Sequence, residues 1–385
     1  MGATKNVNNA TRAALCAAFA MQSAIAAAQG PATPTANAPE AAAPNIYAHI
    51  GTLSAAVEGH KSLVYVPHLQ SNDVYVIDPA TFKVVDKYKV GLNPQHVVPS
   101  WDLQTLWVTN NAEHTDKGTL TPIDPKTGKP GKPIAVHDPY NMYFTPDGKS
   151  AIVVEEAEKK LAFRDPKTMA LQHYVEAPKC PGINHAEFSA DGTFAIFTCE
   201  FGKSVVKIDL AGAKVVDYLR LSKGGMPQDV RSSPDGKRFY VADMQADGVF
   251  VVDPYAFKEV GFIASGKGTH GLYPSRDGKK LYIANRGSHK VHGAKAGPGS
   301  VSVLDFATDK VEVTWPIPGG GSPDMGNVSA DGKWLWLSGR YDHVVYAIDT
   351  ASGQVKIIKV GIEPHGLAVW PQPGRYSLGH TGNMR

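Results

Sequence analysis

Cysteine is scarce in this sequence, with three among 385 residues, and one of these, Cys16, lies in an apolar run near the N-terminus. The chain has no Cys-x-x-Cys-His sequence for covalent haem attachment, no phosphate-binding glycine motif and no Gly-x-Ser-x-Gly nucleophile motif. After the N-terminus, no uninterrupted apolar run reaches the roughly 18 residues of a membrane-spanning helix, and no segment has the pattern of a helix of normal length. These absences argue against c-type haem, the common nucleotide-binding motifs and an α/β-hydrolase.

The N-terminus has the pattern of a secretory signal peptide. Lys5 and Arg12 supply positive charge, no acidic residue precedes Glu40, and the small-residue apolar run ends near Ala28. We therefore expect a signal peptide over residues 1–28, a Pro- and Ala-rich flexible spacer over 29–44, and a single folded domain over 45–385. This interpretation predicts a protein of the periplasm or a secreted protein without a transmembrane segment.

The charge of the chain is close to balanced. The formal net charge is +3, and it falls to about +1 without Lys5 and Arg12. Such a balance favours neither nucleic acid nor an anionic membrane as the partner.

A repeat of about 44 residues dominates the remaining sequence. Segments such as "YFTPDGKSAIVVE", "EFSADGTFAIFTC" and "VRSSPDGKRFYVAD" place an Asp-Gly turn between two strands, and a third strand ending in Asp follows. This period, with four short strands in each unit, is typical of an all-β fold, the β-propeller with four-stranded blades. The turn aspartates Asp102, Asp147, Asp191, Asp235, Asp277 and Asp331 recur at intervals of 45, 44, 44, 42 and 54 residues.

The sequence is compatible with two different numbers of blades. Seven third strands are complete, but there is also an eighth hairpin pattern, "HGLAVWPQPGRYSLG", at residues 365–379. If the N-terminal "NIYAHIG" completes that last unit, the two termini pair in one sheet and close the ring. This interpretation favours eight blades, with seven as the alternative.

The segments "LNPQHVVPSWDLQTLWVTN", "GTHGLYPSRDGKKLYIAN" and "DVYVIDPATFKVVDKYKVG" resemble the YVTN-type repeat of YncE-like β-propellers, which are related in style to the haem d1 domain of cytochrome cd1. The similarity covers residues 46–379. It implies the propeller fold and no particular reaction, because binding proteins, lactonases and redox enzymes share such repeats.

Unusual side chains collect in the loops that lead into each innermost strand and that join the second strand to the third. These loops meet at one mouth of the central channel, and they hold nine of the fourteen histidines, with His380 as a candidate tenth. Imidazole binds copper, zinc, iron and nickel, so we expect copper or another transition metal, or a haem-type cofactor, at this mouth. The candidate metal ligands are His96, His185, His270, His365 and His68, and the other candidate cofactor-binding residues are Asn141, Asp229, Asp324, Arg286 and Arg340.

Two further features of the sequence each allow two interpretations. Cys180 and Cys199 form either a disulfide, which an exported chain favours, or a pair of thiolate ligands near His185. The insertion "NRGSHKVHGAKAGPGS" places His289 and His292 on the same face, where they either cover the mouth or lie in a solvated loop.

Three functions fit these observations. The first is an exported propeller that binds a metal or metallo-cofactor. The second is an enzyme, either a copper or haem d1-like redox enzyme or a lactonase-type hydrolase with a divalent ion at Glu156, Asn141 or Asp229. The third is a platform for a periplasmic protein partner. The four histidines favour the first, with a small ligand or metal at the channel mouth, and no catalytic residue is identified.

Overall fold

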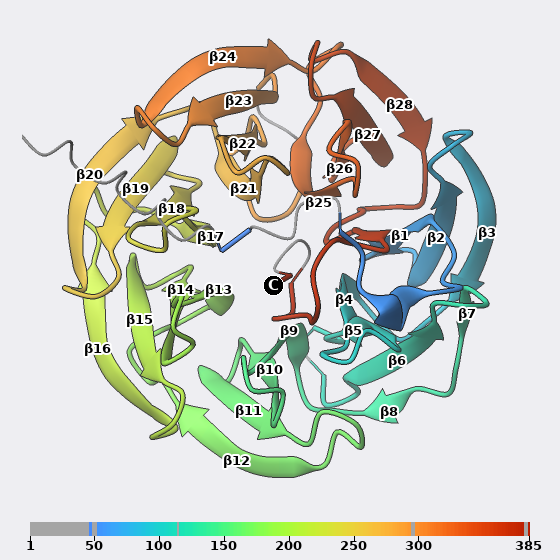
Figure 1. The fold of residues 1–385 in the computed structure, drawn as a ribbon, viewed down its shortest axis with the longest axis horizontal. Coiled ribbons are helices and arrows are strands. Elements are labelled where there is room, and N and C mark those ends of the chain that lie inside the picture. The colour runs from blue at the N-terminus through green and yellow to red at the C-terminus, as the bar shows by residue number, and fades with distance from the viewer. Residues whose placement is uncertain (1–45, 48–51, 114, 294–296, 381–383) are drawn as a thin grey trace, which may run out of the picture. The chain divides into compact units, whose positions relative to one another are not determined.

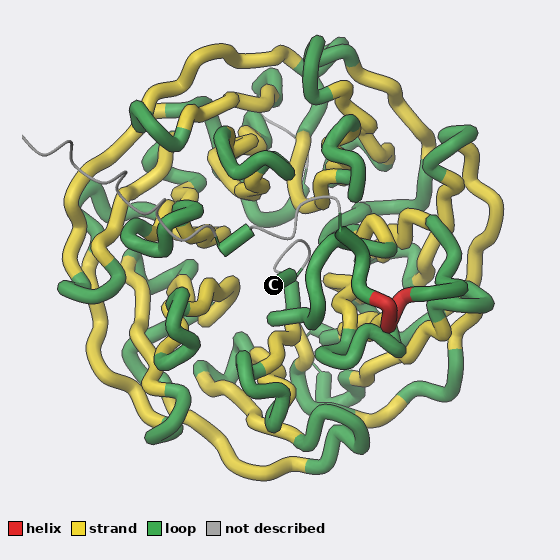
Figure 2. Tube along the Cα trace, in the orientation of Figure 1, coloured by secondary structure: helices red, strands yellow, loops and turns green. Residues whose placement is uncertain are grey.

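The computed structural model describes residues 46–47, 52–113, 115–293, 297–380 and 384–385, and residues 43–385 form one compact unit. The predicted signal peptide and spacer lie outside these residues. The described chain is an all-β propeller whose four-stranded blades surround a central channel (Figure 1). The 3-10 turn Ala55–Val57 is the one helical segment assigned in this part of the chain, as Figure 2 shows.

Each blade is an antiparallel sheet that runs from an innermost strand at the channel to an outermost strand at the rim (Figure 1). The strands, grouped by blade from the innermost outward, are β29 (Ala368–Trp370), β1 (Leu63–His68), β2 (Asp73–Asp78) and β3 (Lys83–Lys89); β4 (Pro94–Pro99), β5 (Leu106–Asn110), β6 (Thr119–Asp124), β7 (Lys129–Pro130) and β8 (Ile134–Ala135); β9 (Pro139–Phe144), β10 (Ala151–Glu155), β11 (Lys160–Arg164) and β12 (Leu171–Glu176); β13 (Ile183–Phe188), β14 (Phe194–Cys199), β15 (Ser204–Asp209) and β16 (Lys214–Arg220); β17 (Pro227–Ser232), β18 (Phe239–Asp243), β19 (Gly248–Asp253) and β20 (Lys258–Ala264); β21 (Thr269–Pro274), β22 (Lys280–Asn285), β23 (Ser300–Asp305) and β24 (Lys310–Pro316); β25 (Pro323–Val328), β26 (Trp334–Gly339), β27 (Val344–Asp349) and β28 (Val355–Lys359). In the second blade, the two short strands β7 and β8 both pair with β6 and together take the place of a single outermost strand.

The Asp-Gly turns join the innermost strand of a blade to the next strand. In the turn after β9, the Asp147 carboxylate accepts hydrogen bonds from the Thr145 hydroxyl at 2.6 Å and the Lys149 backbone N–H at 3.1 Å. Gly148 takes a φ of 68°, which is the left-handed region that glycine enters without a steric penalty. The side chain of Asp147 therefore shapes the turn, and its own backbone does not take a positive φ.

The structure has seven blades, so the expectation of eight is wrong. Residues 365–370 do not begin a new hairpin. Instead β29 pairs with β1, with Leu63 opposite Trp370 and Tyr65 opposite Ala368, and it becomes the innermost strand of the blade that β1, β2 and β3 form. The C-terminal segment therefore supplies the innermost strand of this blade. Most of the "NIYAHIG" segment, which was expected to complete the last unit, lies outside the described residues.

Apolar side chains from neighbouring blades form the core. Ile152 and Phe163 of the third blade pack in one buried cluster with Phe188 and Phe197 of the fourth. Each blade therefore buries its faces against the next, which a single four-stranded sheet cannot do alone.

Cys180 and Cys199 form a disulfide within the fourth blade, where both are fully buried. The bond closes a loop with a sequence separation of 19, and chain-entropy estimates give about 3 kcal/mol for a loop of this length. We therefore expect the Cys180→Ala/Cys199→Ala variant to lose about 3 kcal/mol or more in urea unfolding at pH 7.5. The parent measured with a reductant is the control, and a loss below about 1 kcal/mol in both would contradict a structural role for the bond.

No helix in the described part of the chain is both long and apolar enough to cross a membrane.

Candidate functional site

Each blade contributes one side chain at an equivalent position where its innermost strand enters the channel. In six of the seven blades, the pairing of the innermost strand with its neighbour shifts register at this point. A bulge of this kind changes the direction of a side chain, and here the affected residues are buried at the channel. In blade order from β29 onward, the seven residues are His365, His96, Asn141, His185, Asp229, His270 and Asp324.

Because the ring has seven members, the histidines do not alternate evenly around it. His365 and His96 come from adjacent blades, and their ring centroids are 4.8 Å apart. The rings of His96 and His185 are 5.2 Å apart, and those of His270 and His365 are 6.2 Å apart. The structure therefore gathers the four predicted histidines in one channel, with His96 next to two of them.

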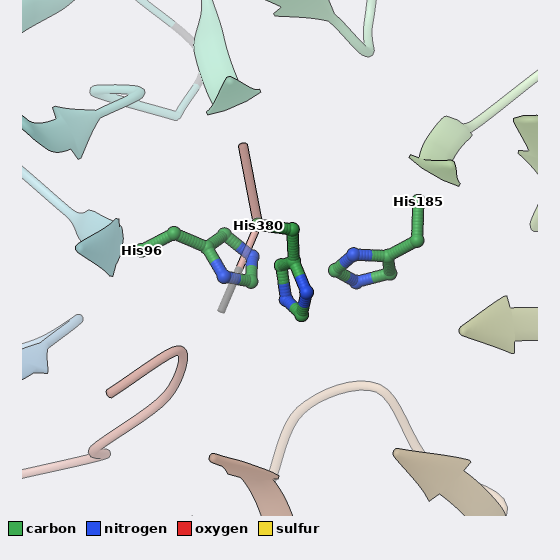
Figure 3. Close-up of side chains that lie close together, drawn as sticks. All are labelled: His96, His185 and His380. Carbon is green, nitrogen blue, oxygen red and sulfur yellow. The ribbon is translucent and has the colours of Figure 1, made fainter. Parts of the chain in front are cut away.

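A fifth imidazole comes from the C-terminal tail. His380 lies between His96 and His185, with ring centroids 4.9 Å and 4.6 Å from theirs (Figure 3). One ligating atom from each of these three residues lies within 4.8 Å of the others. We call His96, His185 and His380 the imidazole triad. The sequence indicated His380 as a candidate tenth histidine of the mouth but not as a metal ligand, because this residue follows the last strand of the repeat pattern.

The triad is buried and uncharged. All three side chains are fully buried, and this desolvation lowers the pKa of His96 to about 3 and the pKa values of His185 and His380 well below the ordinary histidine range. Among the described residues, neither ring nitrogen of His96 has a hydrogen-bond partner, and the same holds for Nε2 of His185. A buried nitrogen without a partner costs about 1–3 kcal/mol, which a bound ion would recover.

Two hydrogen-bond donors occupy nitrogen lone pairs of the imidazole triad. Nδ1 of His185 lies 3.1 Å from the Asn141 amide nitrogen, and Nδ1 of His380 lies 2.8 Å from a nitrogen of the Arg231 guanidinium. Arg231 also donates to the Asp229 carboxylate at 2.8 Å and to the Val230 carbonyl at 2.6 Å. A metal ion therefore competes with Asn141 and Arg231 for these lone pairs, whereas His96 is available to it directly.

A second group surrounds Asp324 in the same channel. His270 Nδ1 lies 2.9 Å from the Asp324 carboxylate, and His365 Nε2 lies 3.7 Å from it. Arg286 donates to Asp324 twice, at 2.7 and 3.2 Å, and an Arg340 nitrogen lies 3.8 Å away. Although burial opposes ionisation, the Arg286 guanidinium and His270 hold the pKa of Asp324 well below its usual range. Asp324 is therefore already paired with a cation, and this makes it a weaker metal ligand than the triad.

A cavity of about 390 Å³ opens at the mouth above these groups. Its lining includes His270, Arg286 and Arg340, which places the two arginines beside the cavity and not in the triad. Tyr140 lines the same cavity, and its ring lies 5.5 Å from that of His96 and 5.9 Å from that of His185. Tyr140 therefore separates the cavity from the triad, a position that the sequence pattern did not reveal.

Two carboxyl groups pair at the wall of the cavity. Glu156 hydrogen-bonds to Glu200, and Glu200 also accepts from the amides of Asn184 and Gln228, both at 3.0 Å. Burial and the charge of Glu200 raise the pKa of Glu156 well above its usual range. The sequence placed Glu156 and Glu200 on this face but did not indicate that the loops of the third and fourth blades bring them together.

The other candidate residues make local contacts. Asp229 pairs with Arg231 at 2.8 Å, and burial raises the pKa of Asp229 to about 6. His68 lies within the first blade, where Nδ1 is 3.1 Å from Asp73 and Nε2 accepts from the Gly361 N–H at 3.0 Å. His68 therefore lies outside both histidine groups of the channel.

Comparison with known proteins identifies the protein family of this chain. The sequence matches the YNCE-like beta-propeller family over residues 24–373, which is most of the chain. The chain belongs to this family. The similarity to YncE-like propellers inferred from the repeats is thus confirmed, together with the all-β propeller of four-stranded blades.

One curated relative of this YNCE-like propeller is Antigen Lp49 of Leptospira interrogans. The two are 27% identical over 305 residues, which cover 73% of this chain and 63% of the relative. The chain therefore spans less than two thirds of the length of that relative.

Solved structures similar to this YNCE-like propeller include proteins of several activities. The periplasmic gluconolactonase PpgL of Pseudomonas aeruginosa has a TM-score of 0.63 at 18% identity, with 79% of this chain and 98% of that chain covered. Dihydro-heme d1 dehydrogenase NirN has a TM-score of 0.59 at 14% identity, with 87% and 79% covered. Hydrazine synthase of Kuenenia stuttgartiensis has a TM-score of 0.58 at 19% identity, with 72% and 90% covered. These likenesses show the shared fold.

Proposed function

We propose that this protein binds one first-row transition-metal ion in its channel through the imidazole triad. The observation that carries the proposal is the convergence of three buried, neutral imidazoles, with one ligating atom of each within 4.8 Å of the others. Metal ions bind the neutral form of histidine, so the lowered pKa values keep the ligands ready at every ordinary pH. Imidazole ligands suit copper, zinc, iron and nickel, and copper(II) binds most tightly in this series.

The spacing of the rings favours a bare ion over a haem-type cofactor. The three triad centroids are 4.6–5.2 Å apart, and they leave no space between them for a planar macrocycle. His365 stands 4.8 Å from His96 and is a further imidazole within reach of the ion. Coordination by His380 would replace its contact with Arg231, which keeps its bonds to Asp229 and the Val230 carbonyl.

Metal titration of EDTA-treated protein, purified without a metal-binding tag, tests the proposal. We expect one equivalent of copper(II) to bind and magnesium to fail, because magnesium requires oxygen ligands. His96→Gln should weaken copper binding by more than about a hundredfold, since losing a residue that only supports a ligand already costs 10–100-fold. Asn141→Leu should strengthen binding, because it removes a donor that competes for His185.

His173→Gln is the matched control, because His173 is exposed on the outermost strand of the third blade. Its copper affinity should equal that of the parent. The proposal would be overturned if His96→Gln bound copper as tightly as the parent. It would also be overturned if Asn141→Leu lost copper binding, because that result would make Asn141 a ligand.

We further propose that the protein is exported, with the periplasm as its compartment. The buried Cys180–Cys199 disulfide supports this, because such bonds persist in oxidising compartments. Fractionation of cells that express the full chain should recover the protein, shortened by about 28 residues, from the periplasm. Recovery of the full-length chain from the cytoplasm would contradict export.

A redox enzyme is the second candidate, because a copper ion held by imidazole ligands can exchange one electron between copper(II) and copper(I). A reversible copper(II)/copper(I) couple in the loaded protein would favour it. Loss of the metal on reduction would leave binding as the function of the site.

A further inference from the structure

The cavity above Tyr140 has the properties of a site for a small molecule. Its volume of about 390 Å³ falls within the range of ligand pockets. Polar side chains and two aromatic rings, Tyr140 and Phe201, share its wall. Phe201 is 54% exposed, and its ring lies against Gly182, where a Cβ atom would come within 2.6 Å of it. Gly182 therefore gives the ring room to lie along the wall.

The two arginines of this wall are already paired. Arg286 donates to Asp324 at 2.7 and 3.2 Å. Arg340 donates to Glu363 from two of its nitrogens, each at 3.0 Å. Both guanidinium groups face their own carboxylates, and Lys159, the lysine of this lining, is exposed to solvent. The buried part of the cavity therefore has little attraction left for an anion.

The acids of the wall are also engaged. Glu200 accepts from two amides and hydrogen-bonds to Glu156, as described above. Glu113 accepts from the Gln95 amide nitrogen at 3.1 Å, and Asp138 accepts from the Ala157 N–H at 2.8 Å. A cation would therefore find these carboxylates occupied by internal donors.

Two neutral acceptors of the same wall are not satisfied. Gln95 Oε1 and Asn111 Oδ1 are buried and have no hydrogen-bond partner among the residues that the structure describes. Their side chains are 2% and 3% exposed, and both residues line the cavity. Each unpaired buried acceptor costs about 1–3 kcal/mol, so a ligand that donates hydrogen bonds to them would recover this energy.

We propose that the cavity binds a small, uncharged, polyhydroxylated molecule whose hydroxyl groups donate to Gln95 and Asn111 and whose carbon face packs on Tyr140 and Phe201. The buried charged groups of the wall have internal partners, Lys159 is exposed to solvent, and the two neutral acceptors have no partner among the described residues, so the complementary ligand supplies O–H donors without a net charge. This site is distinct from the imidazole triad, and its ligand binds with or without a metal ion.

Three pyranoses of different charge test the proposal in EDTA-treated protein by isothermal titration calorimetry: D-glucose, D-glucuronate and D-glucosamine. We expect D-glucose to bind most tightly and D-glucuronate to bind at least about tenfold more weakly. Gln95→Leu and Asn111→Leu should each weaken D-glucose binding by about tenfold or more, because the apolar side chain cannot accept a hydrogen bond.

Gln354→Leu, at an exposed turn before the outermost strand of the seventh blade, is the matched control and should bind D-glucose like the parent. The melting temperature of each variant shows that it is folded. His96→Gln should also leave D-glucose binding unchanged, which separates this proposal from the metal site. The proposal is overturned if D-glucose shows no saturable binding, if D-glucuronate or D-glucosamine binds more tightly, or if folded Gln95→Leu and Asn111→Leu bind D-glucose like the parent.

Discussion

Asp324→Asn is expected to lower the free energy of unfolding by about 3–5 kcal/mol, because it leaves the buried Arg286 guanidinium without its carboxylate. Asp324 is fully buried, and it accepts twice from Arg286 and lies 2.9 Å from His270. Urea unfolding of EDTA-treated protein at pH 7.5 measures the effect. This loss would be the largest that we expect from a single polar substitution in the channel.

Asp86→Asn provides the control for Asp324→Asn. Asp86 also pairs with a cation, Lys129, at 2.6 Å, but the Lys129 side chain is 65% exposed. A solvent-exposed ion pair contributes about 0–1 kcal/mol, so Asp86→Asn should change the unfolding free energy by less than about 1 kcal/mol. Equal losses in the two variants would contradict the role of Asp324 as the counter-charge of the channel.

Acid should destabilise the metal-free protein through its channel histidines. Burial lowers the pKa of His96 to about 3 and that of His270 to about 4, against about 6.5 in an unfolded chain. Well above pH 6.5 both states are neutral, so these residues do not affect stability there. Below pH 6.5 the unfolded chain takes up protons that the folded chain refuses, and stability falls until the pH reaches the folded pKa. Between pH 6.5 and 5, each such ring costs roughly 2 kcal/mol.

A comparison of the parent with His96→Gln isolates this effect. Buried carboxyl groups act in the opposite direction over the same range, since burial raises the pKa of Asp229 to about 6 and the folded state therefore gains protons there. These contributions are common to both proteins. On going from pH 7 to pH 5, His96→Gln should lose about 2 kcal/mol less in urea unfolding than the parent, and an equal loss would show that His96 is not held neutral.

The repeat predicted the blade and the position of the site within it, because turn chemistry and strand alternation are local properties of the sequence. The seven residues that face the channel occupy one register position of the repeat, so their convergence followed from the blade pattern. The blade count did not follow, because "HGLAVW" has the same local pattern whether it begins a new blade or joins β1. The sequence contains no signal for that long-range choice.

The sequence predicted only two of the three members of the imidazole triad, because the third depends on long-range packing. His96 and His185 lie in the repeat and were predicted to meet, whereas His380 reaches the channel from a segment without strand pattern. Tyr140 directly precedes Asn141 in the repeat, but its position between the cavity and the triad depends on a register shift in the pairing of β9 with β10. The pairing of Glu156 with Glu200 likewise depends on how loops of adjacent blades meet.

X-ray absorption at the copper edge of protein loaded with one equivalent of copper(II) tests the metal site most directly. We predict a first shell of three or four imidazole nitrogens, and a different shell with fewer imidazoles when His96→Gln is loaded in the same way. A shell of oxygen ligands without imidazole, or an identical spectrum for the parent and His96→Gln, would contradict metal binding by the imidazole triad.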